Sequence, residues 1–257
     1  MTPTTGTDGG VRTVIDAGIG TVSFYDPRSN SLPGRVLEAL AAAITECAQD
    51  PTVNVLVLRS DGDRVFCAGA SFDELLKIND AAAGQTFFMG FAHVINAMRR
   101  CPKFIIARVQ GKTVGGGVGL AAAADYTLAL DNAAIKLSEL AVGIGPFVVG
   151  PAVERKLGKA AFGALAIAAG AWRSADWARQ HGLYVEIFAD IVALDTAVDN
   201  LAAELAARSP AAMAAIKQIL WQGTADWDTL LAQRAEISGR LVVADFAVNA
   251  IREFKKK

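Results

Sequence analysis

Short apolar runs typical of β-strands alternate with segments of helical periodicity along most of the chain. Two β-branched runs at the start, 11–15 and 21–25, flank a glycine-containing turn and predict an antiparallel hairpin. Helix-like and strand-like segments then follow one another at 34–49, 53–58, 85–98, 104–109, 116–124, 126–130 and 135–137. This alternation predicts an α/β fold with a largely parallel sheet that is covered on both faces.

The last third of the chain changes character, because the patterns there become almost purely helical. Ser174 is expected to cap a helix that Gly182 ends, and a short strand follows at 184–188. From Leu194 onward only helical periodicity remains, and such an appendage cannot bury all its apolar faces alone. We therefore divide the chain into a flexible tail (1–10), an α/β core (11–193) and a C-terminal helical subdomain (194–257).

Composition removes several classes of function. The 257 residues carry 25 Lys and Arg against 26 Asp and Glu, a balance that argues against a nucleic-acid partner. The longest nearly uncharged stretch, 114–130, contains Asp125 at the start of a predicted strand and is a poor membrane span. Three scattered cysteines and two histidines signal neither a disulfide framework nor a metal site. With no secretory signal at the start, we expect a cytoplasmic protein that does not bind membranes.

The most unusual segment is glycine-rich and lies between a predicted strand and a predicted helix. Glycines stand at positions 115, 116, 117 and 119, so a ligand or a packed neighbour must approach this backbone closely. Free N–H groups at a helix start suit a phosphate or a developing oxyanion. The spacing matches neither the dinucleotide fingerprint nor the phosphate-binding loop. Tight packing of helix on strand is the alternative explanation.

Two further segments have the chemistry of a site. A small-residue loop with Ala68, Gly69 and Ala70 follows a predicted strand and precedes a helix, so it also offers free N–H groups. Glu139 is a single carboxylate within an otherwise apolar stretch that leads to Gly143 and Pro146. A lone glutamate in such a place is more often a cap or a surface residue than a catalyst.

In order and spacing, these three segments together resemble the enoyl-CoA hydratase/isomerase (crotonase) family. The resemblance runs over nearly the whole chain, from the first hairpin to Phe254 and Lys255. It implies a crotonase-like ββα spiral core, with the C-terminal helices acting as a trimerisation subdomain. It also implies acyl-CoA thioester substrates, a homotrimer or dimer of trimers, and no cofactor, since coenzyme A is part of the substrate.

The resemblance also implies roles for three positions. The N–H groups of Ala70 and Gly116 would form an oxyanion hole for the thioester oxygen of an enolate, and Glu139 would move protons as general acid and base. Fixed donors cost no reorganisation when charge develops, which makes this arrangement effective. If Glu139 is buried by Leu137, Leu140 and Val142, its pKa should rise into the range useful for acid–base work.

Two departures from the family pattern affect the reaction. Gly119 stands where hydratases of the family carry a second glutamate, which helps to hold the water that adds to the double bond. Phe147 replaces a glycine whose N–H contacts that water, so we expect its ring to crowd the water's place. A single carboxylate suits a delta-3, delta-2 enoyl-CoA isomerase, whereas the abundance of hydratases in the family favours hydration. A catalytically idle CoA-binding member is a third interpretation.

The remaining candidates concern substrate binding. The resemblance implies an acyl pocket near the helix 85–98, and the residues expected to contact substrate are Ala68, Phe88, Phe91, Phe147, Arg28 and Lys255. Arg28 and Lys255 are candidates for the nucleotide phosphates, although a solvated cation is the simpler interpretation of each. His93, in the same helix as the phenylalanines, is interpreted as a structural histidine in preference to a catalytic one.

Overall fold

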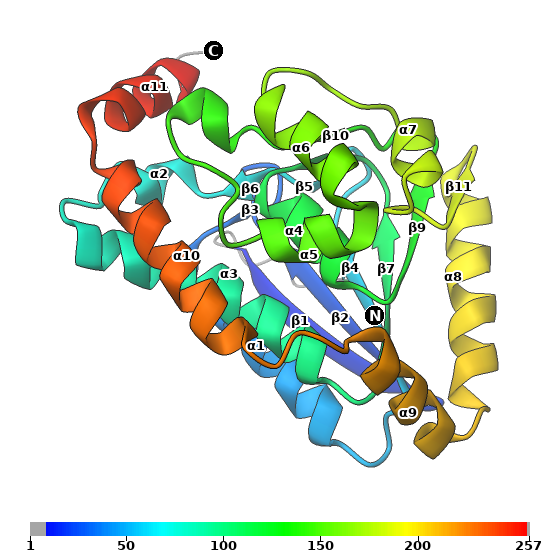
Figure 1. The fold of residues 1–257 in the computed structure, drawn as a ribbon. Coiled ribbons are helices and arrows are strands. Elements are labelled where there is room, and N and C mark those ends of the chain that lie inside the picture. The colour runs from blue at the N-terminus through cyan, green and yellow to red at the C-terminus, as the bar shows by residue number, and fades with distance from the viewer. Residues whose placement is uncertain (1–8, 256–257) are drawn as a thin grey trace.

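The computed structural model describes residues 9–255 and contains a six-stranded main sheet. Its strand order is β1-β2-β4-β7-β9-β11. β1 and β2 form the predicted antiparallel hairpin, and every other neighbouring pair is parallel (Figure 1). The predicted α/β class is therefore confirmed. The strands are β1 (Gly10–Asp16), β2 (Ile19–Tyr25), β4 (Val55–Ser60), β7 (Phe104–Val109), β9 (Tyr126–Leu130) and β11 (Glu186–Phe188).

Two small parallel sheets lie beside the carboxyl ends of these strands. One pairs β3 with β6, and the other has the order β10-β8-β5. Their strands are only two or three residues long, too short for a period-2 pattern, and the sequence predicted loops in most of these places. They are β3 (Ser31–Leu32), β5 (Val65–Cys67), β6 (Gly69–Ala70), β8 (Lys112–Val114) and β10 (Ile135–Lys136).

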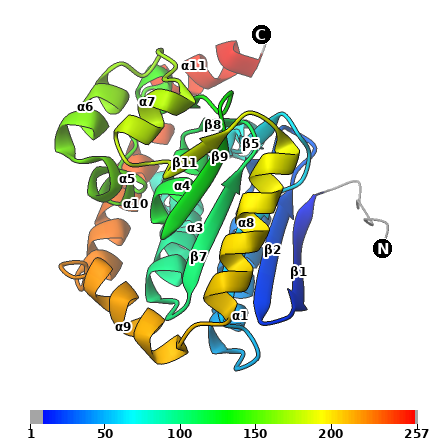
Figure 2. The same cartoon turned by 90° about the vertical axis from the view of Figure 1, so that its right-hand side faces the viewer.

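Helices cover both faces of the main sheet. α1 and α3 lie on one side, and α8 lies against β4, β7 and β9 on the other (Figures 1 and 2). α1 buries the apolar face that its periodicity predicted. In chain order the first helices, including the 3₁₀ helix η1, are α1 (Gly34–Gln49), α2 (Phe72–Leu75), α3 (Ala81–Arg100), α4 (Gly116–Ala123), η1 (Glu139–Val142) and α5 (Gly150–Leu157). The later ones are α6 (Lys159–Ile167), α7 (Ala175–Gln180), α8 (Ile191–Ala206), α9 (Pro210–Leu220), α10 (Trp227–Val242) and α11 (Asp245–Lys255).

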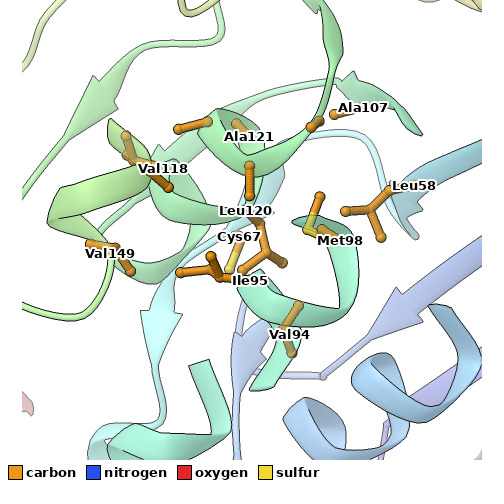
Figure 3. Packing of buried hydrophobic residues seen from close by; sticks show 14 of the residues in the cluster. Leu58, Cys67, Val94, Ile95, Met98, Ala107, Val118, Leu120, Ala121 and Val149 are labelled. Atoms are coloured by element: carbon orange, nitrogen blue, oxygen red, sulfur yellow. The ribbon is translucent and has the colours of Figure 1, made fainter. Parts of the chain in front are cut away.

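The short helix α4 is the centre of the core. All of its residues are buried, which is expected of a helix that is apolar on every side. Figure 3 shows Val118, Leu120 and Ala121 of α4 among buried side chains of α3, with Cys67 and Val149 close by. The glycine-rich N-terminus of α4 is therefore held by packing on several sides.

The C-terminal helices pack onto the rest of the molecule in several places. The predicted boundary at 194 falls within α8, which begins at Ile191 after the capping residue Asp190. α10 lies along α3, and α11 contacts η1 (Figure 1). Of the predicted tail, residues 1–8 lie outside the described part, and Gly10 already belongs to β1. Ser174 caps α7 as predicted, accepting a hydrogen bond from the Trp177 N–H. Across residues 9–255 no helix has the length and apolar character needed to cross a membrane.

Candidate active site

A pocket collects most of the residues that the sequence singled out. Seven of the nine predicted site residues line it; Arg28 and Lys255 do not. The other lining residues are mostly apolar, and within the described part of the chain only Ser138, Glu139 and Ser238 bring a polar side-chain group to the pocket. The full lining is Ala68, Gly69, Ala70, Phe72, Leu75, Phe88, Phe91, Gly115, Gly116, Ser138, Glu139, Val142, Ile144, Gly145, Pro146, Phe147, Val148, Val149 and Ser238.

The two predicted oxyanion segments touch each other at the pocket wall. Gly69 has a φ of +87°, and a Cβ there would lie 3.0 Å from the Val114 carbonyl oxygen and 3.4 Å from the Gly116 nitrogen. The Gly69 N–H is 3.4 Å from the Cys67 Sγ, which accepts its hydrogen bond. Only glycine permits this backbone angle and this close approach together. The segment that carries Ala70 is thus set directly against the start of α4.

Each glycine of the 115–117 triplet has a packing reason. Gly115 has a φ of +52°, and a Cβ on Gly116 would lie 2.2 Å from the Phe91 ring. A Cβ on Gly117 would lie 2.6 Å from that of Cys67. Gly116 is also the first residue of α4, so its N–H has no acceptor within the helix. The packing explanation therefore holds for all three glycines, and it leaves the Gly116 N–H without an acceptor inside the helix, so a ligand contact at this position stays a prediction.

Glu139 lies at the start of η1, with its carboxylate beside the glycine triplet. A Cβ on Gly115 would be 3.0 Å from its Oε1. Its Oε2 is buried and has no hydrogen-bond partner among residues 9–255. Desolvation raises the pKa of Glu139 from 4.5 to about 7, in the direction that its apolar neighbours predicted. A carboxyl group with such a pKa can both accept and donate a proton near neutral pH.

The burial of Glu139 does not come from all three predicted neighbours. Leu137 and Val142 are buried, but Leu140 is 51% exposed, so the expectation that Leu140 desolvates the carboxylate is wrong. The reason is the 3₁₀ turn of η1, which directs consecutive residues to different sides.

Val149 is a wall residue that sequence reasoning missed. A Cβ on Gly119 would lie 2.5 Å from Cγ1 and 2.6 Å from Cβ of Val149. The Phe147 ring lies instead against Gly145, 2.5 Å from a Cβ placed there. The space beside Gly119 is therefore closed by Val149, and a larger residue at 119 cannot fit without moving it. No local pattern marks this contact, because Val149 reaches α4 only through the tertiary fold.

Arg28 and Lys255 lie at a second hollow that shares Ala68, Ala70 and Phe72 with the pocket. Both cations form ion pairs with Asp73, at the start of α2. The Lys255 contact links α11 to α2, and the Phe254 ring packs edge-on against Phe72. The structure thus places the two predicted phosphate candidates together at the mouth, with a carboxylate between them.

His93 lies outside the pocket. Its side chain is exposed on α3 and borders an open groove between α1 and α3. This position agrees with the preference for a non-catalytic residue, and the exposed side chain faces away from the core that Phe88 and Phe91 enter.

Comparison with known proteins places this geometry in a family. The family model for enoyl-CoA hydratase/isomerase matches residues 14–253. The chain belongs to the enoyl-CoA hydratase/isomerase family. The protein named "Probable enoyl-CoA hydratase" of Bacillus subtilis strain 168 is 26% identical over 245 residues, 95% of this chain and 94% of the relative. The carnitinyl-CoA dehydratase of Salmonella paratyphi A is 29% identical over 77% of this chain and 75% of its own length.

Solved structures agree with this family assignment. The crystal structure of an enoyl-CoA hydratase from Mycobacterium avium has a TM-score of 0.80 at 25% identity and covers 96% of each chain. The predicted crotonase-like fold and the family resemblance are therefore confirmed.

Proposed function

We propose that this enoyl-CoA hydratase/isomerase family member moves the double bond of a 3-enoyl-CoA to the 2 position. The observation that carries the proposal is Glu139, the one carboxylate that lines the pocket among residues 9–255, whose Oε2 has no partner there and whose pKa is raised to about 7. One such group can take a proton from one carbon and return it to another. Val149 beside Gly119 leaves no room there for a second acid.

The reaction balances with this chain's own groups. The Glu139 carboxylate takes a proton from C2, and the electron pair of that C–H bond forms the enolate, with negative charge on the thioester oxygen. The N–H groups of Ala70 and Gly116 stabilise this charge. Protonated Glu139 then gives its proton to C4, so that the double bond moves from C3–C4 to C2–C3. Glu139 ends in its starting form.

The nucleotide part of the substrate would lie at the mouth of the pocket. Arg28 and Lys255 meet there beside the hollow that adjoins Ala70, and both suit phosphate groups. Coenzyme A enters as part of the substrate, so the proposed reaction needs no separate cofactor and no metal. The three cysteines are buried free thiols, which favours a reducing, cytoplasmic location.

Hydration of a 2-enoyl-CoA is the second candidate. It is favoured by the relatives, since the proteins from Bacillus subtilis and Mycobacterium avium are both named enoyl-CoA hydratases. Hydration would need a water held by Glu139 together with groups other than a second carboxylate in the pocket.

Product analysis separates the two candidates. Purified protein is incubated with a 3-enoyl-CoA and, separately, with the matching 2-enoyl-CoA, and the products are separated by chromatography against authentic standards and identified by retention time and mass. We expect the 3-enoyl thioester to give its isomer without a change in mass, and hydration to be slow in comparison. Rapid formation of a 3-hydroxyacyl-CoA, 18 Da heavier by one water, by the unmodified protein would show that the single-carboxylate argument fails.

We also propose that the chain assembles as a homotrimer or a dimer of trimers. Three large apolar side chains of α9 are half exposed or more: Ile216, Ile219 and Leu220. An apolar face of this kind suits burial between subunits. Light scattering on the purified protein should give a trimer or hexamer, and a monomer at micromolar concentration would overturn the proposal.

A further inference from the structure

The inner end of the pocket is bounded by two helices that touch through their backbones. α3 and α10 pack together more extensively than any other pair of elements (Figure 1). A Cβ on Gly84 of α3 would lie 2.8 Å from the Gly239 Cα, and one on Gly239 would lie 2.4 Å from the Gln85 nitrogen. Two glycines in register bring the helices too close for an alkyl chain to pass between them at this point.

Pocket residues lie immediately beside this contact. Phe88 is one helical turn after Gly84, and Ser238 directly precedes Gly239. Both line the pocket and are almost fully buried. The contact between Gly84 and Gly239 therefore closes the helix pair just behind the wall that Phe88 and Ser238 form.

Two further sides of the pocket are closed by packed side chains. Phe91 lies against Gly116, and Val149 lies against Gly119. On the opposite side the pocket shares Ala68, Ala70 and Phe72 with the hollow at Arg28 and Lys255. A thioester with its oxygen near Ala70 would use that opening for its coenzyme A part, so the acyl chain must extend inward. The free volume of the pocket is about 50 Å³, enough for about four water-sized groups.

We infer that this site is specific for short acyl chains of about four to six carbons, and that Phe88, backed by the contact of α3 with α10, sets the limit. The inference rests on the proposed function, because it assumes that the thioester binds at Ala70 and Gly116. A longer chain has to displace the Phe88 ring or separate two helices that touch at Gly84 and Gly239, and overpacked cores resist such shifts.

Binding of saturated acyl-CoA thioesters tests the length limit without depending on turnover. Calorimetry with two-, four-, six-, eight- and twelve-carbon thioesters should show affinity increasing about fourfold for each added methylene at first. We expect the increase to stop by six carbons and the twelve-carbon thioester to bind at least about tenfold more weakly than the best one. Affinity that continues to rise to twelve carbons would overturn the length limit.

Phe88→Ala and Phe87→Ala form a matched pair of variants. Both remove a phenyl ring from the same aromatic cluster of α3, but Phe87 does not line the pocket. We expect Phe88→Ala to raise the affinity for the eight-carbon thioester about tenfold or more, and Phe87→Ala to leave the length preference unchanged. Equal effects of both variants would mean general loosening of α3, and would remove Phe88 as the determinant.

Turnover of enoyl thioesters over the same lengths keeps this inference apart from the proposed function. Selective binding of short chains without turnover of any 2- or 3-enoyl-CoA would contradict the proposed reaction and leave the length limit standing. Equal turnover of four- and twelve-carbon substrates would contradict the length limit and leave the reaction standing.

Discussion

Two buried carboxylates, Asp125 and Glu139, differ in how many partners the fold gives them. Asp125, just before β9, has a side chain only 5% exposed and is surrounded by partners. Its Oδ2 is 2.8 Å from the Lys217 Nζ and accepts the Ile105 N–H at 2.8 Å. Its Oδ1 accepts the Trp221 Nε1–H at 3.1 Å. Glu139, in the pocket, has a buried Oε2 without a partner among the described residues.

Under the proposed function, this difference separates a structural carboxylate from one that takes part in the reaction. Asp125 joins β7, β9 and α9, so its charge is compensated by the same contacts that hold the helix in place. The Oε2 of Glu139 has no such partner among residues 9–255, and the raised pKa leaves this carboxyl group able to exchange a proton with a bound molecule. A buried oxygen without a partner is costly for folding, and the proposed reaction would give the Glu139 carboxylate a use that offsets this cost.

The largest effect is expected from removing the acid–base group. Glu139→Gln should lower turnover by about a thousandfold or more, because the amide can neither accept nor return the proton at C2 and C4. Binding of a saturated acyl-CoA should remain, since the thioester donors are backbone groups. Steady-state kinetics measures turnover and calorimetry measures binding of the saturated acyl-CoA, both on the same preparation. Turnover close to that of the unmodified protein would remove Glu139 from the mechanism.

The matching change at the structural carboxylate should act on stability instead. Asp125→Asn leaves the Lys217 ammonium, 3% exposed, without its counter-charge, and should cost about 3–5 kcal/mol in the free energy of unfolding. Turnover of the folded variant should be nearly unchanged, because Asp125 does not line the pocket. Urea unfolding measures the free energy of unfolding, and an activity assay without urea measures the turnover of the folded variant. As a control, the double variant with Asp125→Asn and Lys217→Met should recover part of the lost free energy of unfolding, because no unpaired charge is left buried.

The pH dependence of stability should also distinguish the two sites. The pKa of Glu139 is about 7 in the folded protein and near 4.5 when the chain is unfolded. Between pH 4.5 and pH 7 the folded state binds the Glu139 proton more tightly than the unfolded state does. The protonated side chain therefore adds its full contribution to the free energy of unfolding below about pH 4.5, and this contribution is lost as the pH rises through 7. The unmodified protein should therefore lose about 2–3 kcal/mol over this window relative to Glu139→Gln. If the free energy of unfolding changed with pH in the same way in the unmodified protein and in Glu139→Gln, the raised pKa would be contradicted.

Sequence reasoning succeeded where a pattern is local and long enough to repeat. The α1 face, the first hairpin and the Ser174 cap are of this kind, and the structure has all three. Four of the seven pocket residues, Ala68, Ala70, Gly116 and Glu139, were found through the order and spacing of three motifs. The three phenylalanines, Phe88, Phe91 and Phe147, were expected only from the family resemblance. The family resemblance, and not periodicity, joined these motifs into one site.

What escaped prediction depends on contacts between distant segments. Val149 closes the space beside Gly119 only because α5 packs on α4. Lys217 and Trp221 reach Asp125 from about ninety residues further along the chain, so Asp125 was interpreted only as a polar break before a strand. Leu140 is exposed because it lies in a 3₁₀ turn of four residues, and a segment this short has no sequence period from which the turn could be predicted.

The smallest expected effect tests which neighbouring side chains exclude water from the Glu139 carboxylate and so raise its pKa. Val142 is 3% exposed and lines the pocket with Glu139, whereas Leu140 of the same turn is 51% exposed. Because Glu139 must be ionised to accept a proton, kcat/KM should rise with pH through a pKa near 7. Val142→Ser brings a polar group beside the carboxylate and should lower this kinetic pKa by up to about one unit, while Leu140→Ser should leave it unchanged. Equal shifts of the kinetic pKa in both variants would mean that the geometry of η1, and not the burial of one side chain, raises the pKa of Glu139. The contrast between Glu139 and Asp125 would then depend only on the missing hydrogen-bond partner of Glu139.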